Sequence, residues 1–315
     1  MAGFEVTPNY DGSWSPHIFA LQLVMAFYAS TCLADIANTD YQGEITGKGS
    51  KVVIALTPEL DIHDYIPGQE LDYQNLDPNT VELYIDKAKY FAMNVDDVFK
   101  KQWNQAYDQK AIENGAQKMK IAIETDVFAN IYLDVAAANK PAASAGTGGA
   151  ISNSYVLGSN DATPVAVASA AANDAILGHI TGMAAVLDEQ NIPRDGKRWL
   201  ILPTGLTRNL KMSGLKNANE MGDDQSVLRK GAVGTLDGFT IYNSNLLPYV
   251  TAGTPSSGYK VYFGHKSALT FATQLTQTDV LVNPKSFGTV MRSLNVYGYK
   301  VVKPEAIGVA YLKIS

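Results

Sequence analysis

The chain has 315 residues, of which 46% are hydrophobic and 18% charged, and its formal net charge is −6 at pH 7. These proportions exclude an intrinsically disordered chain, and the length suits one large domain or two smaller ones. The acidic balance excludes a global positive field that would draw the whole molecule to nucleic acid, although a local basic patch is compatible with it. The single cysteine, Cys32, excludes an intramolecular disulfide and a cysteine-rich zinc site.

The first segment, residues 1–49, is expected to form an N-terminal arm that contains a helix. Ser15 followed by Pro16 is a typical N-cap and first-turn pair, and an apolar run over 18–29 follows it. The run is shorter than the roughly 20 apolar residues of a transmembrane helix. The first basic residue is Lys48, so the charged start of a signal peptide is absent. We therefore expect a soluble cytoplasmic protein that folds in a reducing compartment and has no membrane segment.

Residues 50–93 are predicted to form an extended β-hairpin loop. Two strand-like runs, "SKVVIALTP" and "NTVELYIDKAKYFAMN", flank a segment with turn signals at Pro67-Gly68 and Asp77-Pro78. Between Val52 and Asp86 there is no Lys or Arg. An isolated hairpin is marginal in water, and this one has little core of its own. It should therefore lie on another surface, and that surface should be basic.

A long helix is predicted from Val95 onward, with Asn94 or Asp96 as its cap. The apolar stripe has steps of three and four, and about 40 residues of helix would measure ~60 Å. Gly115 is expected to mark a bend. The long helix and the loop of small residues that follows it are together assigned to residues 94–162. The stripe consists of Ile112, Ala116, Met119, Ile123, Val127, Ile131 and Val135.

A second, mixed α/β domain is predicted over 163–290. Apolar residues at helical spacing, from Ala172 to Leu187, predict a helix that ends before Ile192-Pro193. The run "KRWLILPTGL" predicts a buried strand over 199–202 that turns through Pro203 into a short helix. The alternating residues near the C-terminus predict a closing strand, and 291–315 is assigned to a return to the first domain.

The sequence offers no catalytic or metal-binding pattern. The four histidines, His17, His63, His179 and His265, are not at ligand spacing, and there is no HExxH or GxSxG motif. Cys32 lies in an apolar segment, where an inert buried thiol is expected. We therefore predict no catalytic residue, no cofactor and no metal.

The glycine-rich stretch "GAVGTLDG", 231–238, follows Arg229 and Lys230 and at first suggests a phosphate loop. A Walker loop needs Lys and Ser/Thr directly after its last glycine, and a dinucleotide fingerprint needs a helix there. Here Gly238 is followed by a strand-like run that starts at Phe239. Tight turns, in which glycines accept positive φ, are the better interpretation.

The order of these elements resembles the major capsid proteins of tailed bacteriophages, whose fold is shared by herpesvirus capsid floors and encapsulins. Five segments in chain order carry the resemblance: "KAKYFAMNVDDVFKKQ", "RWLILPTGL", "LRKGAVGTLDGFTIYNSNLLP", "GHKSALTFATQL" and "YGYKVVKPEAI". The resemblance implies an α+β fold with an N-terminal arm, an extended β-hairpin loop, a peripheral domain with a long spine helix, and an axial α/β domain.

The resemblance also implies a function. Such a protein self-assembles into hexamers and pentamers of an icosahedral shell that encloses double-stranded DNA without sequence-specific binding. Implied partners are a portal protein, a separate scaffolding protein and a cement or decoration protein. The implied location is the virion capsid, assembled in the bacterial cytoplasm. Because the loop has no lysine between Val52 and Asp86, covalent crosslinking through a loop lysine is not expected.

We further predict that acidic residues of the loop pair with lysines of the spine helix in a neighbouring subunit. Three alternatives stay open at this point: an encapsulin-type compartment with an enzyme cargo, an α/β enzyme with a site near Gly231–Gly238, and a tail-tube or decoration subunit. The predicted intersubunit residues are Glu59, Asp61, Asp64, Glu70, Asp72, Lys100, Lys101, Lys118 and Lys120.

Overall fold

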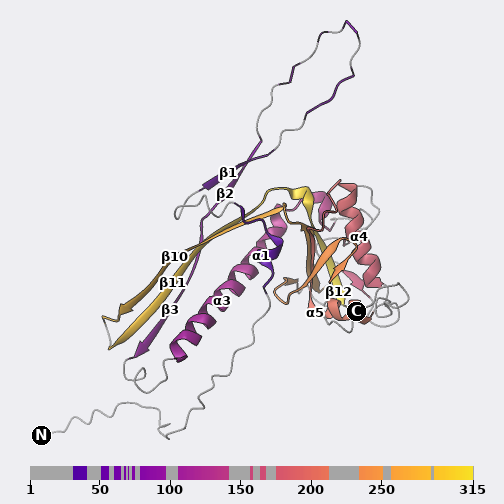
Figure 1. Cartoon of the computed structure of the whole chain (residues 1–315). Helices are drawn as coiled ribbons and strands as arrows, with labels where there is room; N and C mark the ends of the chain where they lie inside the picture. Colours follow the sequence, from indigo (N-terminus) through magenta and orange to yellow (C-terminus); the bar gives the residue numbers. More distant parts are fainter. Residues whose placement is uncertain are drawn as a thin grey trace, which may run out of the picture.

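A computed structural model shows an elongated part, built from a long sheet and one helix that run side by side, and a more compact part of mixed strands and helices (Figure 1). The structure describes residues 31–40, 51–56, 60–64, 67–68, 70, 73–74, 79–96, 106–141, 157–158, 164–167, 175–212, 234–250, 257–284 and 287–314.

The elongated part is a three-stranded antiparallel sheet with a helix beside it. The strand order is β10 (Leu269–Val282), β11 (Gly288–Val301), β3 (Lys87–Asp96). The helix α3 (Ala106–Asn130) runs along this sheet and continues into a 3-10 turn, η2 (Ile131–Asp134). The fold is therefore α+β, as predicted.

The predicted start of the long helix is wrong. Residues 87–96 form β3, which pairs along its whole length with β11, so that Asp96 lies opposite Gly288. Asn94 and Asp96 are thus strand residues and not helix caps. The described part of the long helix is Ala106–Asn130, and residues 97–105 lie outside the described residues. Pairing with a strand some 200 residues further along the chain overrides the local helical pattern.

The predicted bend at Gly115 is also wrong, and this glycine has a different role. Gly115 lies inside the continuous helix α3, and a Cβ there would be 3.0 Å from the ring of Phe91 on β3. The missing side chain lets the helix approach the sheet closely. The predicted stripe is buried from Met119 through Val135, whereas Ala116, one turn earlier, is exposed.

The compact part is a seven-stranded mixed sheet. Along the sheet the order is β4 (Val165–Val167), β12 (Ile307–Ile314), β9 (Gly258–His265), β5 (Arg198–Leu202), β7 (Phe239–Asn243) and β6 (Thr235–Leu236), while β8 (Tyr249–Val250) pairs with β9. The last expected segment, 291–315, divides between the two sheets. Its first part, up to Val301, belongs to β11 of the long sheet, and its last part forms β12 of the compact sheet.

Both faces of the seven-stranded sheet are covered. On one face α4 (Ala175–Glu189) and α5 (Thr204–Met212) pack on Leu200, Leu202 and Phe263. On the other face the C-terminal half of α3 packs on Ile201, Tyr262 and other residues. This coverage explains why every residue of β5 is buried, which confirms the predicted buried strand. The predicted end of α4 before Ile192-Pro193 is also confirmed.

The extended hairpin begins where β1 (Lys51–Ala55) pairs antiparallel with β2 (Thr80–Tyr84). The inward-facing residues Val52, Ile54 and Leu83 pack on Ala272 and Val296 of the long sheet. This contact fixes the base of the hairpin on the long sheet, and the described residues of the loop between the two strands lie away from the rest of the chain (Figure 1).

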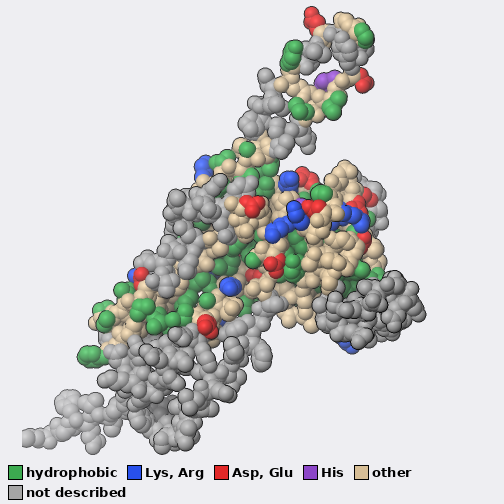
Figure 2. Space-filling model, in the orientation of Figure 1, with side chains coloured by type: hydrophobic (Ala, Val, Ile, Leu, Met, Phe, Trp, Pro, Cys, Tyr) green, Lys and Arg blue, Asp and Glu red, His purple; other side chains and the backbone are tan. Residues whose placement is uncertain are grey.

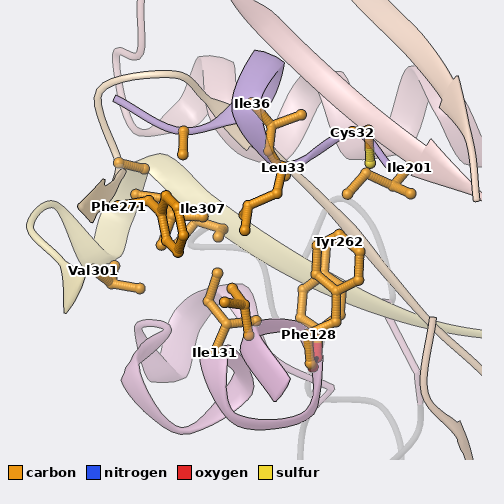
Figure 3. Packing of buried hydrophobic residues seen from close by; sticks show 14 of the residues in the cluster. Cys32, Leu33, Ile36, Phe128, Ile131, Ile201, Tyr262, Phe271, Val301 and Ile307 are labelled. Carbon is orange, nitrogen blue, oxygen red and sulfur yellow. Dashed lines mark hydrogen bonds between the residues drawn. The ribbon is translucent and has the colours of Figure 1, made fainter. Parts of the chain in front are cut away.

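Before the hairpin, a short segment of the N-terminal arm packs into the core. It contains a single helical turn, α1 (Leu33–Ile36), whose Leu33 and Ile36 point toward α3 and the strands beside it (Figure 3). The helix expected after Ser15-Pro16 lies outside the described residues. In the described part of the chain, no helix has the length and apolar character needed to cross a membrane.

Candidate functional site

The projecting loop exposes large apolar side chains. Every described residue between Leu60 and Gln74 is exposed, including Ile62 at 96% and Tyr73 at 84%. The hydrogen bonds in this stretch are local, as between the Asp61 N–H and Gln74 Oε1 at 3.2 Å. The described residues of the loop are therefore not buried against their own chain, in line with the prediction that the hairpin has little core of its own.

A second exposed apolar group lies at the far end of the long sheet, which we call the distal tip. It is formed by Val280, Leu281 and Val282 at the end of β10 and by Phe287 just before β11, with Val282 81% and Phe287 87% exposed. In Figure 2 the hydrophobic side chains gather at this end of the molecule. Contiguous exposed apolar side chains of this kind make the distal tip a candidate contact surface.

Five of the nine predicted charged residues are described, three on the loop and two on α3. Asp61, Asp64 and Glu70 are exposed on the loop, and Lys118 and Lys120 are exposed on α3. No ion pair joins these acids to these lysines among the described residues of one chain. Their pairing between subunits stays a prediction. The other four predicted residues, Glu59, Asp72, Lys100 and Lys101, lie outside the described residues.

Both described glycines of "GAVGTLDG" have positive φ, and Gly238 forms a tight turn before a strand, as predicted. Asp237 and Gly238 both have positive φ, 47° and 79°, and form the two-residue turn between β6 and β7. Gly234 also has positive φ, at 66°. Asp237 accepts a hydrogen bond from Arg194 at 2.9 Å, so the carboxylate of this turn already pairs with a cation. Gly231 lies outside the described residues.

His265 forms hydrogen bonds that the sequence did not reveal, and they link two loops of the compact part. The backbone N–H of Ser267 donates to His265 Nδ1 at 3.2 Å, and His265 Nε2 lies 3.0 Å from Asp195 Oδ1. With Nδ1 acting as acceptor, the ring proton lies on Nε2, toward Asp195. The ring thereby ties the turn after β9 to the loop before β5. The partner Asp195 is 70 residues away in sequence, so no local motif signals the contact.

The other two described histidines, His63 and His179, do not share a site, and His17 lies outside the described residues. His179 on α4 is half-buried, and burial lowers its pKa, which agrees with the predicted place at the edge of the core. His63 is exposed on the loop, and its Nε2 lies 3.2 Å from Gln74 Nε2. The described ranges contain no cluster of three or more His, Cys, Asp or Glu arranged to hold a metal ion.

A further buried group was also missed by sequence reasoning. Glu124 on α3 is 1% exposed, and its Oε2 accepts the backbone N–H groups of Cys32 at 2.8 Å and Leu33 at 3.0 Å. Burial raises the pKa of this carboxyl. The α3 helix thus holds the N-terminal segment through one buried acid.

Comparison with solved structures shows which known proteins share this fold. No protein-family model and no curated protein matches the chain. Solved structures do: one from Mycobacterium phage Che8 is 22% identical, with a TM-score of 0.69 over 95% of this chain and 97% of that chain. The capsid of cyanophage P-SCSP1u is 16% identical, with a TM-score of 0.66 over 94% and 92%. The mature capsid of bacteriophage PhiM1 is 14% identical, with a TM-score of 0.62 over 94% and 91%.

The likeness spans nearly the whole of each chain, so it concerns the complete architecture and not one shared motif. The chain therefore has the fold of phage capsid proteins, which confirms the fold that the sequence resemblance implied.

Proposed function

We propose that this protein is a major capsid protein, which self-assembles into hexamers and pentamers of an icosahedral shell around double-stranded DNA. The observation that carries the proposal is the phage capsid fold over about 95% of the chain. The location that follows is the virion capsid, with assembly in the bacterial cytoplasm.

The exposed surfaces support assembly on physical grounds. The loop exposes Leu60, Ile62 and Tyr73, and the distal tip exposes Val282 and Phe287. Burying an apolar side chain contributes about 1.5–3 kcal/mol relative to leaving it exposed. Both groups lie at extremities that one chain cannot cover, whereas copies of the chain packed side by side can cover them.

Charge would set the orientation of these contacts. Under the proposal, the exposed loop acids Asp61 and Asp64 face Lys118 and Lys120 of a neighbouring α3. Each exposed pair contributes little, about 0–1 kcal/mol, but the contact is repeated in every subunit. Like-charge repulsion between misplaced loops would also disfavour wrong arrangements.

We also propose a separate scaffolding protein, a portal protein and a cement or decoration protein as partners. The net charge of −6 supports a wall that does not bind the packaged DNA tightly. An encapsulin-type compartment is the less favoured alternative, because the similar structures named above come from phages. A structural role is favoured over an α/β enzyme because Gly238 forms the tight turn between β6 and β7, and Gly234 directly precedes β6.

The test is electron microscopy of the protein expressed alone and with candidate scaffolding proteins. Closed icosahedral shells, or curved sheets of hexamers and pentamers, are expected. A uniform monomer or dimer under every condition would contradict the proposal. Cargo then separates the alternatives, because nucleic acid and a portal indicate a virus and a bound enzyme indicates a compartment.

A further inference from the structure

The outer edge of β10 is paired near its start but not, by any described residue, at the distal tip. β10 is the last strand in the order β10-β11-β3, and its outer edge has one bridge among the described residues, between Thr270 and Asn38. There the Asn38 N–H donates to the Leu269 carbonyl at 2.7 Å, and the Asn38 carbonyl accepts the Phe271 N–H at 3.0 Å. The start of this edge thus already binds an extended segment.

The backbone groups of Val280 and Val282 face the unpaired part of this edge. The Asn283 N–H donates to the Gly288 carbonyl at 2.9 Å, so the backbone groups of Asn283 point to β11. Successive residues of a strand alternate in this direction, so the groups of Leu281 also point to β11 and those of Val280 and Val282 point outward. In the part of the chain that the structure describes, no residue bonds to these outward groups.

Residues 277–282 contain neither the lysine nor the proline that often protects an exposed strand edge. Their only charged residue is Asp279, and Arg292 of β11 pairs with it, with Nη2 2.8 Å from Oδ2. Val280, Leu281 and Val282 are exposed. The edge therefore suits a partner strand that is apolar and uncharged, as this strand itself is.

The long sheet has a different neighbour on each face. Phe271 and Tyr297 lie in one core cluster with α3, whereas Ala272 and Val296 lie in another with the base of the hairpin. A two-fold axis perpendicular to the sheet would bring two β10 edges together antiparallel and keep both copies of α3 on the same face. The subunits of a closed shell must share their inner and outer faces in this way, so the pairing of two identical edges is compatible with a shell.

We propose that the partner of this edge is the same edge of a second copy of the chain, with the two copies of Leu281 opposite each other. The inference rests on the proposed function, which brings copies together, and it specifies how two of them join. Val280 of each copy then lies opposite Val282 of the other, and each such pair exchanges N–H···O=C hydrogen bonds in both directions. Two three-stranded sheets thereby become one continuous sheet.

Side-chain matching selects this register. It places Leu281 opposite an identical apolar side chain, and it places Asp279 opposite the polar residue Asn283. A shift by two residues in either direction would place Leu281 opposite Asp279 or Asn283, which leaves an apolar side chain against a polar one.

A cysteine at position 281 tests the contact directly. Leu281→Cys is purified as the full chain and oxidised both as the free subunit and in any shells that it forms. Disulfide-bonded dimers are expected, because residues in such a pair have Cα atoms about 4.5 Å apart, within the range that a disulfide spans. Phe287→Cys is the matched control, exposed at the same tip but outside the strands, and should give several-fold fewer dimers. The native chain gives the background, since its Cys32 is buried.

A proline at position 280 tests the backbone pairing. The Val280 N–H faces outward, so Val280→Pro removes no hydrogen bond to β11, and proline is tolerated at such edge positions. In the pair it removes one donor from each copy, so the dimer yield of the Leu281→Cys variant should fall about tenfold or more. Val280→Thr keeps the N–H and the β-branched shape, and it should change that yield by less than about twofold. Circular dichroism confirms that each variant is folded.

Absence of Leu281→Cys dimers from both free subunits and shells overturns the proposal, as do equal yields with Val280→Pro and Val280→Thr. Loss of shells in Val280→Pro without Leu281→Cys dimers would mean that a different strand occupies the edge, which also overturns it. If Val280→Pro does not fold, the comparison of Leu281→Cys with Phe287→Cys decides alone. Shells without these dimers overturn the edge pairing and leave the proposed function intact, whereas dimers without shells support the pairing and contradict the proposed function.

Discussion

The Cα of Gly298 on β11 lies so close to the backbone of Tyr84 at the end of β2 that a Cβ on Gly298 would be 2.2 Å from the Tyr84 carbonyl oxygen. The same Cβ would be 3.0 Å from the Cα of Ile85. Because backbone atoms cannot rotate away as a side chain can, this contact determines where the hairpin crosses the long sheet.

Gly298→Ala should therefore displace the base of the hairpin and lower the free energy of unfolding by about 1–3 kcal/mol. Thermal unfolding of the variant measures the effect. The control is Gly178→Ala, in helix α4, where an added Cβ would meet nothing within 4 Å. That control should raise stability by about 0.5–1 kcal/mol. Equal effects of the two changes would show that the crossing is not sterically determined.

Arg198 should be a major contributor to the stability of the compact part. Its side chain is fully buried, and it donates to Asp188 Oδ1 at 2.7 Å and to the Pro193 carbonyl at 3.1 Å. Arg198→Met removes donors from these acceptors and should cost about 2–4 kcal/mol in chemical unfolding. Arg194→Ala removes an exposed cation from the same Asp188 and should cost less than about 1 kcal/mol. A larger loss in the second variant would contradict this order.

The carboxyl of Asp188 should make stability fall in acid. Its hydrogen bonds from Arg194 and then Arg198 hold its pKa below the ordinary 3.8. A group with a lowered pKa stabilises the fold above the ordinary value, and this contribution is lost as the pH falls through the lowered pKa. Asp188→Asn should therefore melt at a lower temperature than the native chain at neutral pH, and the difference should shrink in acid. A difference that is constant with pH would argue against this origin.

Reversing the charge of Lys118 and Lys120 together should reduce the yield of shells and leave the melting temperature of the subunit nearly unchanged. Both lysines are exposed on α3 and form no ion pair among the described residues. Adding Asp61→Lys and Asp64→Lys should restore the yield, since it exchanges the two signs. Lys303→Glu, another exposed lysine, is the control. Unchanged yield in the first variant would exclude the predicted pairing.

Polar replacement of the exposed apolar residues should separate assembly from folding. Ile62→Ser in the loop and Phe287→Ser at the distal tip remove side chains that are 96% and 87% exposed. Each should change subunit stability by less than about 0.5 kcal/mol, as surface changes usually do. Each should nevertheless reduce shell yield in quantitative electron microscopy. Leu133→Ser, which alters a 74% exposed leucine away from both groups, should reduce it less.

The predicted start of the long helix shows where sequence reasoning stops. Residues 95–96 carry acidic and β-branched side chains that fit a helix start or a strand end equally well. Their pairing with β11 decides for the strand, and that pairing joins residues far apart in the chain. Local periodicity contains no information on such a partner.

The composition, the order of the elements and several individual elements follow from the sequence alone. The continuous apolar run of β5 before Pro203, the stripe of α4 and the positive-φ glycines of the 234–238 turn are local features, and each is recognisable from neighbouring residues. Only the tertiary structure decides the places of Glu124 and His265. Their partners are 92 and 70 residues away, so the contacts exist only once the chain has closed those distances. A buried acid and an exposed one look the same in a sequence, because burial is a property of the packed chain.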